Sequence, residues 1–355
     1  MRVGIIAESL AERLALALGK VPEPIVDAFP PLVLARSIMA ASRLGIFHAL
    51  DDCPLTASQV AARCGTDPRA TVALLDVLTS AGYVTERRGA YRLASKMRRW
   101  LDHESASEVD AYLRFNYLQW TWLDNLEVFL RSGTPVAFHG KLSAAEWKFY
   151  ERGMVALARL TLPEVIWRVR LPRDASTLLD LGGGHGLAAA SFCQRYPVLR
   201  ATVLDLPSAL DAAPQLPAAL ASVEPRMSRV AGDALTADLG REAYDVIYVA
   251  NLVHHFDAAD NEALARRIAA ALRPGGLWVI QDGIREHARR SQRMPAAIGN
   301  LYFALTSASG FWSFEEMAGW QQHAGLQPRR GIHLLTAPGQ GLQIGIKPRA
   351  GGQRP

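Results

Sequence analysis

Cysteine is scarce in this sequence of 355 residues, which contains three: Cys53, Cys64 and Cys193. Their odd number and the lack of C-x-x-C spacing argue against a disulfide framework and a cysteine-based zinc site. The pattern favours buried thiols in a reducing compartment, so we expect a cytoplasmic protein.

A run of residues suited to a membrane is also lacking. One uncharged stretch, residues 294–314, is long enough, but it contains Pro295, Gly299, Asn300 and several Ser and Thr residues. So much polarity opposes insertion, and the stretch predicts a buried helix and loop. At the amino terminus apolar residues alternate with Glu8 and Glu12, which predicts an amphipathic helix rather than a secretory signal. We expect no membrane association.

Strong charge of one sign is absent as well. The chain has 39 basic and 34 acidic residues, a net charge of +5. This balance does not supply the concentrated basic face that binding to a nucleic-acid backbone requires. Apolar residues make up 50% of the chain, which excludes intrinsic disorder, and the length favours two domains.

Short helices followed by a hairpin are predicted between residues 30 and 100. Pro30 and Pro31 open a helix that runs to Ser42, and Thr56 to Gln59 form a capping box for a second helix that stops at Gly65. A third helix is predicted from Asp67 to Gly82, with an apolar face at Val72, Leu75, Val77 and Leu78. Two strands within Tyr83–Leu93 then form a hairpin around a turn at Arg88-Gly89.

This order of elements predicts a winged helix, for which two functions compete. A winged helix can place its third helix in the major groove of DNA. Here that helix offers a single basic residue, Arg69, opposed by Asp76. We therefore favour a scaffold or dimerisation domain, and we expect no nucleic-acid partner.

From Ser176 onward the pattern changes to alternating strands and helices. Near-continuous apolar strands separated by helices predict a parallel sheet covered on both faces. The predicted strands are Thr177–Leu181, Ala201–Asp205, Tyr244–Val249 and Leu277–Ile280, and a helix is predicted from Asn261 to Leu272. The fold class is thus α/β, a Rossmann-like carboxyl-terminal domain joined to a mostly helical amino-terminal domain.

A glycine-rich turn, Asp180-Leu-Gly-Gly-Gly-His-Gly186, follows the first of these strands. A dinucleotide fingerprint G-x-G-x-x-G would need glycine at 187, where the chain has Leu187. The turn fits D-x-G-x-G-x-G, which holds the methionyl part of S-adenosylmethionine (SAM). Asp205 ends the next strand, where a carboxylate binds ribose hydroxyls, and Gly232-Asp233-Ala234 follows at a third strand end. Together with Arg273-Pro-Gly-Gly276, this order predicts a site for an adenosine-type cofactor.

With these motifs in place, residues 30–345 resemble the two-domain SAM-dependent O-methyltransferases, which include plant caffeate-type and bacterial antibiotic-tailoring enzymes. Further matching segments are Tyr150–Met154 and Val253–Phe256. The resemblance implies a winged-helix dimerisation domain (1–104), a helical linker that contributes to the substrate pocket (105–170), a SAM-binding Rossmann-like domain (171–348) and a disordered tail (349–355). It also implies a homodimer and a small-molecule substrate.

The resemblance also assigns roles to individual residues. His254 takes the place of the family's general base toward a hydroxyl group, with His255 beside it and Glu286 as the acid that orients the imidazole. Two larger sets follow. Cofactor-binding residues are expected to be Asp180, Gly182, Gly183, Gly184, Gly186, Asp205, Leu206, Gly232, Asp233, Ala234 and Asn251, and substrate-binding residues Phe115, Trp120, Met154, Asn300, Tyr302, Phe303 and Phe311.

Two departures from the family pattern leave other functions open. His255 replaces an aspartate, and Phe311-Trp312 replaces a second orienting acid. Methylation of a small aromatic or polyketide-like hydroxyl compound is the first hypothesis. Methylation at nitrogen or carbon, a reaction in which SAM donates no methyl group, and a SAM-sensing DNA-binding regulator are the alternatives. Asp257 and Asp260 are interpreted as the acidic start of a helix rather than as metal ligands, so no metal is expected.

Overall fold

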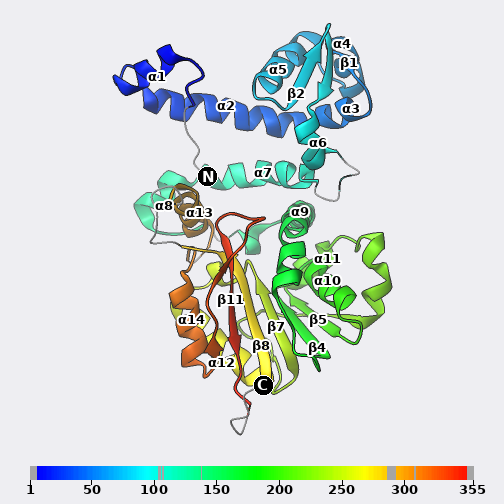
Figure 1. Cartoon of the computed structure of the whole chain (residues 1–355), viewed down its shortest axis with the longest axis vertical. Helices are drawn as coiled ribbons and strands as arrows, with labels where there is room; N and C mark the ends of the chain where they lie inside the picture. Colours follow the sequence, from blue (N-terminus) through cyan, green and yellow to red (C-terminus); the bar gives the residue numbers. More distant parts are fainter. Residues whose placement is uncertain are drawn as a thin grey trace. The chain divides into compact units, whose positions relative to one another are not determined.

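The computed structural model describes residues 6–102, 105, 108–136, 138–285, 293–307 and 309–349. The chain divides into two compact units, residues 2–117 and residues 118–355 (Figure 1). Residues 105–117 of the predicted linker therefore group with the first unit and residues 118–170 with the second. Six residues of the predicted tail, 350–355, lie outside the described residues.

The first unit consists of helices around a small antiparallel sheet with strand order β1-β3-β2. Its elements are α1 (Leu10–Ala17), α2 (Glu23–Arg43), α3 (Ile46–Asp52), β1 (Leu55–Thr56), α4 (Ala57–Cys64), α5 (Pro68–Ser80), β2 (Val84–Arg87), β3 (Ala90–Leu93), α6 (Ser95–Leu101) and the start of α7 (Asp110–Leu123).

The three predicted helices and the hairpin that follows them are confirmed in this unit as α2, α4, α5 and β2–β3, with the short helix α3 in addition between α2 and α4. Thr56 and Gln59 form a reciprocal capping box at the start of α4, and the Asp67 carboxylate caps α5. The hairpin turn has positive φ at Arg88 (53°) and Gly89 (77°), the conformation that a two-residue type I′ hairpin turn needs.

Three local predictions were wrong here. Pro30 and Pro31 lie inside α2, which begins seven residues earlier at Glu23 behind the cap residue Pro22. Val72, predicted on the buried face of α5, is exposed. Cys53 is also exposed rather than buried, because it follows the last turn of α3 in extended backbone, whereas Cys193 is buried and all three thiols are free.

An apolar surface runs along α1 and α2. Seven large apolar side chains there are at least 39% exposed: Leu10, Leu14, Leu18, Ile25, Phe29, Leu32 and Val33. By length and composition α2 is the one helix in the described chain that could cross a membrane, and 17% of its most apolar window is buried. The expected amphipathic helix at the amino terminus is α1, none of whose side chains is buried.

The second unit is an α/β domain. Its elements are α8 (Leu126–Ser132), η1 (His139–Lys141), α9 (Ala144–Arg168), β4 (Thr177–Leu181), α10 (Leu187–Arg195), β5 (Arg200–Asp205), α11 (Pro207–Ala212), η2 (Ala218–Arg226), β6 (Met227–Ala231), β7 (Tyr244–Ala250), η3 (Val253–His255), α12 (Ala258–Ala271), β8 (Leu272–Gly283), α13 (Arg293–Thr306), α14 (Phe314–His323), β9 (Gln327–Pro328), β10 (Ile332–His333) and β11 (Gln340–Ile346).

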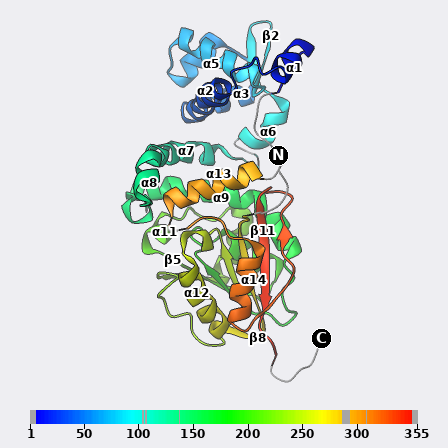
Figure 2. The same ribbon diagram turned by 90° about the vertical axis from the view of Figure 1, so that its left-hand side faces the viewer.

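The sheet of this unit has the order β10-β11-β8-β7-β4-β5-β6, with β9 paired to β11. The predicted parallel strands pair in parallel, but β11 runs antiparallel to β8, so the sheet is mixed. Side chains of neighbouring residues on β4 lie on opposite faces of the sheet. Leu178 packs in the core beneath α9 and α10, and Leu179 packs in the core beneath α12 and α14. Figures 1 and 2 show the α12–α14 pair on its face of the sheet.

Strand β4 lies between β5 and β7. The next strands in sequence, β5 and β6, lie on one side of β4, and the later strands β7 and β8 lie on its other side. In open α/β sheets ligands bind beyond the carboxyl ends of the strands at such a switch point. The predicted glycine turn follows β4 at this position.

The uncharged stretch 294–314 is a helix and loop, as expected, but it is not uniformly buried. Met294, Ile298 and Leu301 on α13 are 42%, 55% and 43% exposed, whereas Leu305 is buried. The prediction of a buried helix was therefore wrong for one side of α13.

Candidate active site

The turn after β4 depends on glycine for both its conformation and its close contacts. Gly182 has φ 72°, and a Cβ there would lie 2.9 Å from Leu252. Gly183 would place a Cβ 2.5 Å from Cγ of Asp180. Asp180 itself is buried and accepts a hydrogen bond from the Ala189 N–H at 3.1 Å, so its carboxyl group fixes the turn to the start of α10.

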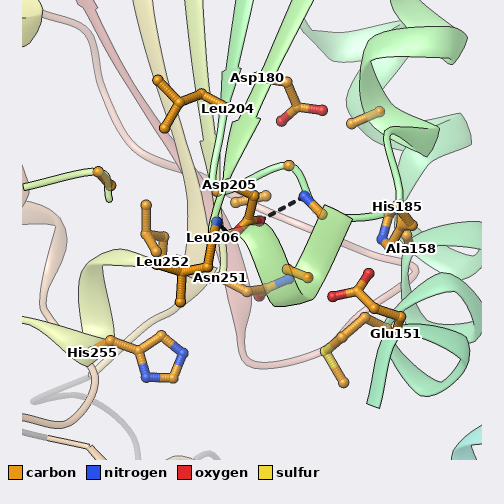
Figure 3. Close-up of a pocket in the computed structure, with 18 of the residues that line it drawn as sticks. Glu151, Ala158, Asp180, His185, Leu204, Asp205, Leu206, Asn251, Leu252 and His255 are labelled. Atoms are coloured by element: carbon orange, nitrogen blue, oxygen red, sulfur yellow. Dashed lines mark hydrogen bonds between the residues drawn. The ribbon is translucent and has the colours of Figure 1, made fainter. Parts of the chain in front are cut away.

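Asp205 at the end of β5 connects the neighbouring strand to this turn. Its Oδ2 accepts a hydrogen bond from the Gly184 N–H and its Oδ1 one from the Leu206 N–H, both at 2.7 Å (Figure 3). Gly232 after β6 donates its N–H to the Asp205 carbonyl at 2.9 Å. Three strand ends are thereby joined around one cavity.

Asn251 closes the cavity after β7 with a left-handed backbone, φ 50°. Its N–H donates to the Gln281 carbonyl at 2.8 Å, and the Gln281 side chain accepts a hydrogen bond from the buried Tyr248 hydroxyl. A non-glycine residue in this region is uncommon and is found at sites held by their surroundings. Here the hydrogen bond to Gln281 on the neighbouring strand β8 holds the backbone of Asn251 in this conformation.

Most residues of the predicted cofactor set line this cavity. They are Asp180, Gly182, Gly183, Gly184, Asp205, Leu206, Gly232, Asp233, Ala234 and Asn251. Gly186 is not among the lining residues; a Cβ there would lie 3.2 Å from Met227 and 3.5 Å from Val203, so this glycine permits close packing of α10 on the sheet.

Three carboxyl groups surround the turn, of which those of Asp180 and Glu151 are buried and that of Asp205 is half-buried (Figure 3). Burial raises the pKa of Asp180 to about 7 and that of Glu151 to about 8, and it also raises the pKa of Asp205. The negative charge of Asp205 adds to the shift at the other two groups. Such a cluster favours a cationic ligand, because a positive charge would stabilise the ionised carboxylates.

His254 forms a buried pair with Asp282. Its Nδ1 lies 2.7 Å from Asp282 Oδ1, and the two side chains are 3% and 2% exposed. The Phe303 ring packs against the imidazole with a centroid distance of 3.8 Å. His254 Nε2 makes no hydrogen bond with any residue that the structure describes, so this nitrogen is free to accept a proton.

The acid expected to orient His254, Glu286, lies outside the described residues. Asp282, four residues earlier near the end of β8, contacts the histidine. Its Oδ1 also accepts the Gly283 N–H at 2.6 Å.

His255 and His139 form the cavity wall next to this pair. Both line the cavity, and their ring centroids are 4.6 Å apart. His255 Nδ1 lies 2.6 Å from the Ser307 hydroxyl, and His139 Nε2 lies 3.4 Å from the Tyr150 hydroxyl. Burial lowers the pKa of His139 to about 4 and that of His255 well below its ordinary value, so both rings are neutral at pH 7.

The predicted substrate set is dispersed. Met154 lines the cavity, and Phe303 and Phe311 pack near His254. Tyr302 accepts a hydrogen bond from Gln119, and the Asn300 side chain accepts the Phe311 N–H.

Two aromatic residues of this set are not among the residues that line the cavity. Trp120 belongs to α7 in the second unit and is not among the lining residues. Phe115 is buried in the unit of residues 2–117.

Family models match both parts of the chain. Residues 124–322 match an O-methyltransferase domain, and residues 31–102 match an O-methyltransferase dimerisation domain. The chain belongs to the O-methyltransferase family. The predicted resemblance and the SAM-dependent methyltransferase activity are thereby confirmed.

The relatives that follow cover between 76% and 96% of the O-methyltransferase chain. The tetracenomycin polyketide synthesis 8-O-methyltransferase of Streptomyces glaucescens is 30% identical over 89% of this chain and 94% of its own length. The L-tyrosine C(3)-methyltransferase of Streptomyces lavendulae is 26% identical over 76% and 77%. The crystal structure of human N-acetylserotonin methyltransferase in complex with SAM is 20% identical, covers 96% of this chain and 99% of its own, and superposes with a TM-score of 0.80.

The cavity of this O-methyltransferase fits the family's cofactor. SAM carries a sulfonium and an ammonium group, and the carboxyl groups of Asp180, Asp205 and Glu151 provide the complementary charge. Gly182 and Gly183 hold the turn close against Leu252 and Asp180, since a side chain at either position would collide with these neighbours.

The sequence reasoning missed three residues of this O-methyltransferase site: Asp282, Glu151 and His139. Asp282 had a usable signal, because an acid that follows a strand next to that of His254 ends at the same edge of the sheet. Glu151 lies in the segment Tyr150–Met154 that matches the family, but its burial depends on how α9 packs. No motif in the residues around His139 indicated that it belongs to the site.

Proposed function

We propose that the enzyme transfers a methyl group from SAM to a hydroxyl group of a small aromatic or polyketide-like metabolite, with His254 as the general base. The observation that carries this proposal is the buried His254–Asp282 pair with its free Nε2. The substrate class is supported by the relative from Streptomyces glaucescens, whose name specifies 8-O-methylation in polyketide synthesis.

The proposed chemistry follows from the protonation states of the pair. Asp282 accepts the Nδ1–H, which leaves the lone pair on Nε2. A phenolic hydroxyl, with a pKa of about 10, is a poor nucleophile until Nε2 removes its proton. The ionised Asp282 then stabilises the imidazolium. SAM, when bound, supplies an electrophilic methyl group whose departure leaves a neutral thioether.

His255 is proposed as a positioning residue for the acceptor. It lines the cavity, whereas His254 does not, and the two ring centroids are 4.2 Å apart. A hydroxyl group that approaches His254 from the cavity therefore passes the neutral His255 ring. Phe303, which packs on His254, is proposed as part of the same acceptor site.

The test is incubation with SAM and a panel of phenols, naphthols and hydroxylated polycyclic quinones, followed by mass spectrometry. We expect one added methyl group on oxygen for part of the panel. His254→Ala is expected to lose at least about a hundredfold in turnover while it keeps its affinity for S-adenosylhomocysteine. Wild-type turnover in this variant would overturn the assignment of the base.

Methylation of carbon is the second candidate. It is favoured by the similarity to the L-tyrosine C(3)-methyltransferase of Streptomyces lavendulae. An ortho carbon of a phenol also becomes nucleophilic when the hydroxyl is deprotonated, so the same base serves. The position of the methyl group in the product, read by nuclear magnetic resonance, distinguishes the two candidates.

We further propose a homodimer formed through the amino-terminal domain (1–104), without nucleic-acid or membrane partners, in the cytoplasm. The match of residues 31–102 to a dimerisation domain supports the dimer, and so does the exposed apolar surface of α1 and α2. A partner chain packed on this surface would bury the apolar side chains that α2 exposes within one chain. We assign residues 105–170 to the linker and residues 171–348 to the cofactor-binding part.

A further inference from the structure

Glu151 is a buried acid that the proposed mechanism leaves without a role. It lies on α9, eight residues after the cap Ser143, and is 3% exposed. Its carboxylate points into the cavity toward the glycine turn (Figure 3). A Cβ at Gly184 would lie 2.8 Å from its Oε2, so this oxygen occupies the space directly over the turn.

The Oε2 atom of Glu151 lacks a donor. The carboxyl groups that line the cavity are those of Glu151, Asp180, Asp205 and Asp233. Among them, within the described chain, Glu151 alone has a buried oxygen without a hydrogen-bond partner. By contrast, each oxygen of Asp205 accepts a backbone N–H. An unpaired buried carboxylate oxygen is costly, and it marks a place where a ligand supplies the missing donor.

A cationic N–H donor would fill the vacant acceptor and also offset the negative charge of Glu151 beside Asp205. SAM carries two positive centres, a sulfonium without hydrogen-bond donors and an α-ammonium with three. Only the ammonium satisfies both the charge and the vacant acceptor of Glu151. We propose that Glu151 binds the α-ammonium group of SAM and so recognises the amino-acid end of the cofactor. This inference depends on the SAM dependence of the enzyme.

We expect Glu151 to release a proton when the ammonium group binds. With a pKa of about 8, Glu151 is largely protonated at pH 7 in the absence of cofactor. An ammonium group favours the carboxylate, so its binding releases up to about 0.9 proton at pH 7. The groups around Glu151 are Asp205 and His185 across the turn, Tyr150 on its own helix, and Arg159 beyond His185. Asp180 and Asp205 also have raised pKa values, so the contribution of Glu151 must be isolated by substitution.

Calorimetry in buffers of different ionisation enthalpy tests this proposal. S-adenosylhomocysteine keeps the ammonium but has no sulfonium, and 5′-methylthioadenosine lacks the whole amino-acid end. For the wild type we expect comparable proton release with SAM and S-adenosylhomocysteine, and less with methylthioadenosine. Glu151→Gln should weaken S-adenosylhomocysteine binding at least about tenfold, reduce its proton release, and leave methylthioadenosine affinity unchanged.

Glu146→Gln is the matched control, because Glu146 lies on the same helix in the Ser143 capping box, which glutamine also supports. It should bind all three ligands as the wild type does. Equal weakening of methylthioadenosine by Glu151→Gln would show a structural role and overturn the proposal. An effect on SAM alone would assign Glu151 to the sulfonium and also overturn it. If wild-type protein binds none of the three nucleosides, the failure lies in the cofactor assignment instead.

Discussion

The Nδ1 atom of His254 lies 2.7 Å from Oδ1 of Asp282, and neither side chain is accessible to solvent beyond a few per cent. The two residues come from neighbouring strands, since His254 follows β7 and Asp282 lies near the end of β8. Asp282 therefore fixes both the orientation and the tautomer of the imidazole. The second oxygen, Oδ2, has no partner in the described chain, so the carboxylate keeps capacity to stabilise an imidazolium.

Asp282→Asn should uncouple this pair while it preserves the size of the side chain. The amide can donate to Nδ1, which moves the imidazole proton to Nε2 and removes the base. We expect turnover to fall at least about a hundredfold, with S-adenosylhomocysteine affinity unchanged.

The control is Asp257→Asn, which alters the cap of α12 and retains a residue that caps well. It should behave as the wild type. Full turnover in Asp282→Asn, measured by product formation over pH 5 to 9, would show that Asp282 does not position the base.

Gly183→Ala should abolish cofactor binding. The added Cβ would lie 2.5 Å from Cγ of the buried Asp180, so either the turn or the carboxyl group must move. We expect a loss of about 1–3 kcal/mol in the free energy of unfolding, as for other overpacked sites, and no calorimetric signal with S-adenosylhomocysteine. Gly319→Ala on α14 is the control, because a Cβ there meets nothing within 4 Å; it should stabilise the helix by about 0.5–1 kcal/mol. Unchanged binding in Gly183→Ala would show that the cofactor does not use this turn.

The sequence predicted those parts of the fold that local chemistry determines. The capping box at Thr56, the Arg88-Gly89 turn and the buried strand β4 each depend on residues close together in the chain. Pairing between strands that are distant in the chain was harder to predict from the sequence. The prediction ended the strand of β8 at Ile280, whereas pairing with β11 extends it to Gly283.

The same limit explains the errors at the site. Because β8 continues through Asp282, this acid lies beside His254, and the prediction, which ended the strand at Ile280, did not include it in the site. Glu151 could not be distinguished from a solvated acid, since a position on α9 does not reveal what packs against it. The glycine turn and Asp205 were accessible because their spacing along one βαβ segment determines where they meet.

His139→Phe should flatten the pH dependence of stability. Because the pKa of His139 falls to about 4 in the folded protein, the unfolded chain binds a proton below pH 6.5 that the folded chain does not. This residue therefore lowers stability as the pH falls from 6.5 toward 4. The raised pKa values of Glu151 and Asp180 act in the opposite direction, so the comparison must be made with the variant.

Between pH 7 and pH 5 the wild type should lose up to about 2 kcal/mol more than His139→Phe, from 1.36 kcal/mol per pKa unit. Urea unfolding of the cofactor-free protein at each pH measures this difference. The exposed His323, 69% accessible at its side chain, provides the control: His323→Gln should retain the wild-type slope. Parallel curves for His139→Phe and wild type would contradict a buried neutral His139.

Phe29→Glu combined with Leu32→Glu should convert the proposed dimer to monomers. Both side chains lie on α2 and are 64% and 47% exposed within one chain, and contiguous apolar surface of this kind marks an interface. Two carboxylates there would be buried without partners on association, which opposes it. Sedimentation velocity measures the change. Val198→Glu, at an equally exposed apolar residue of the other unit, should leave the dimer intact. A dimer that survives the α2 double substitution would place the interface elsewhere.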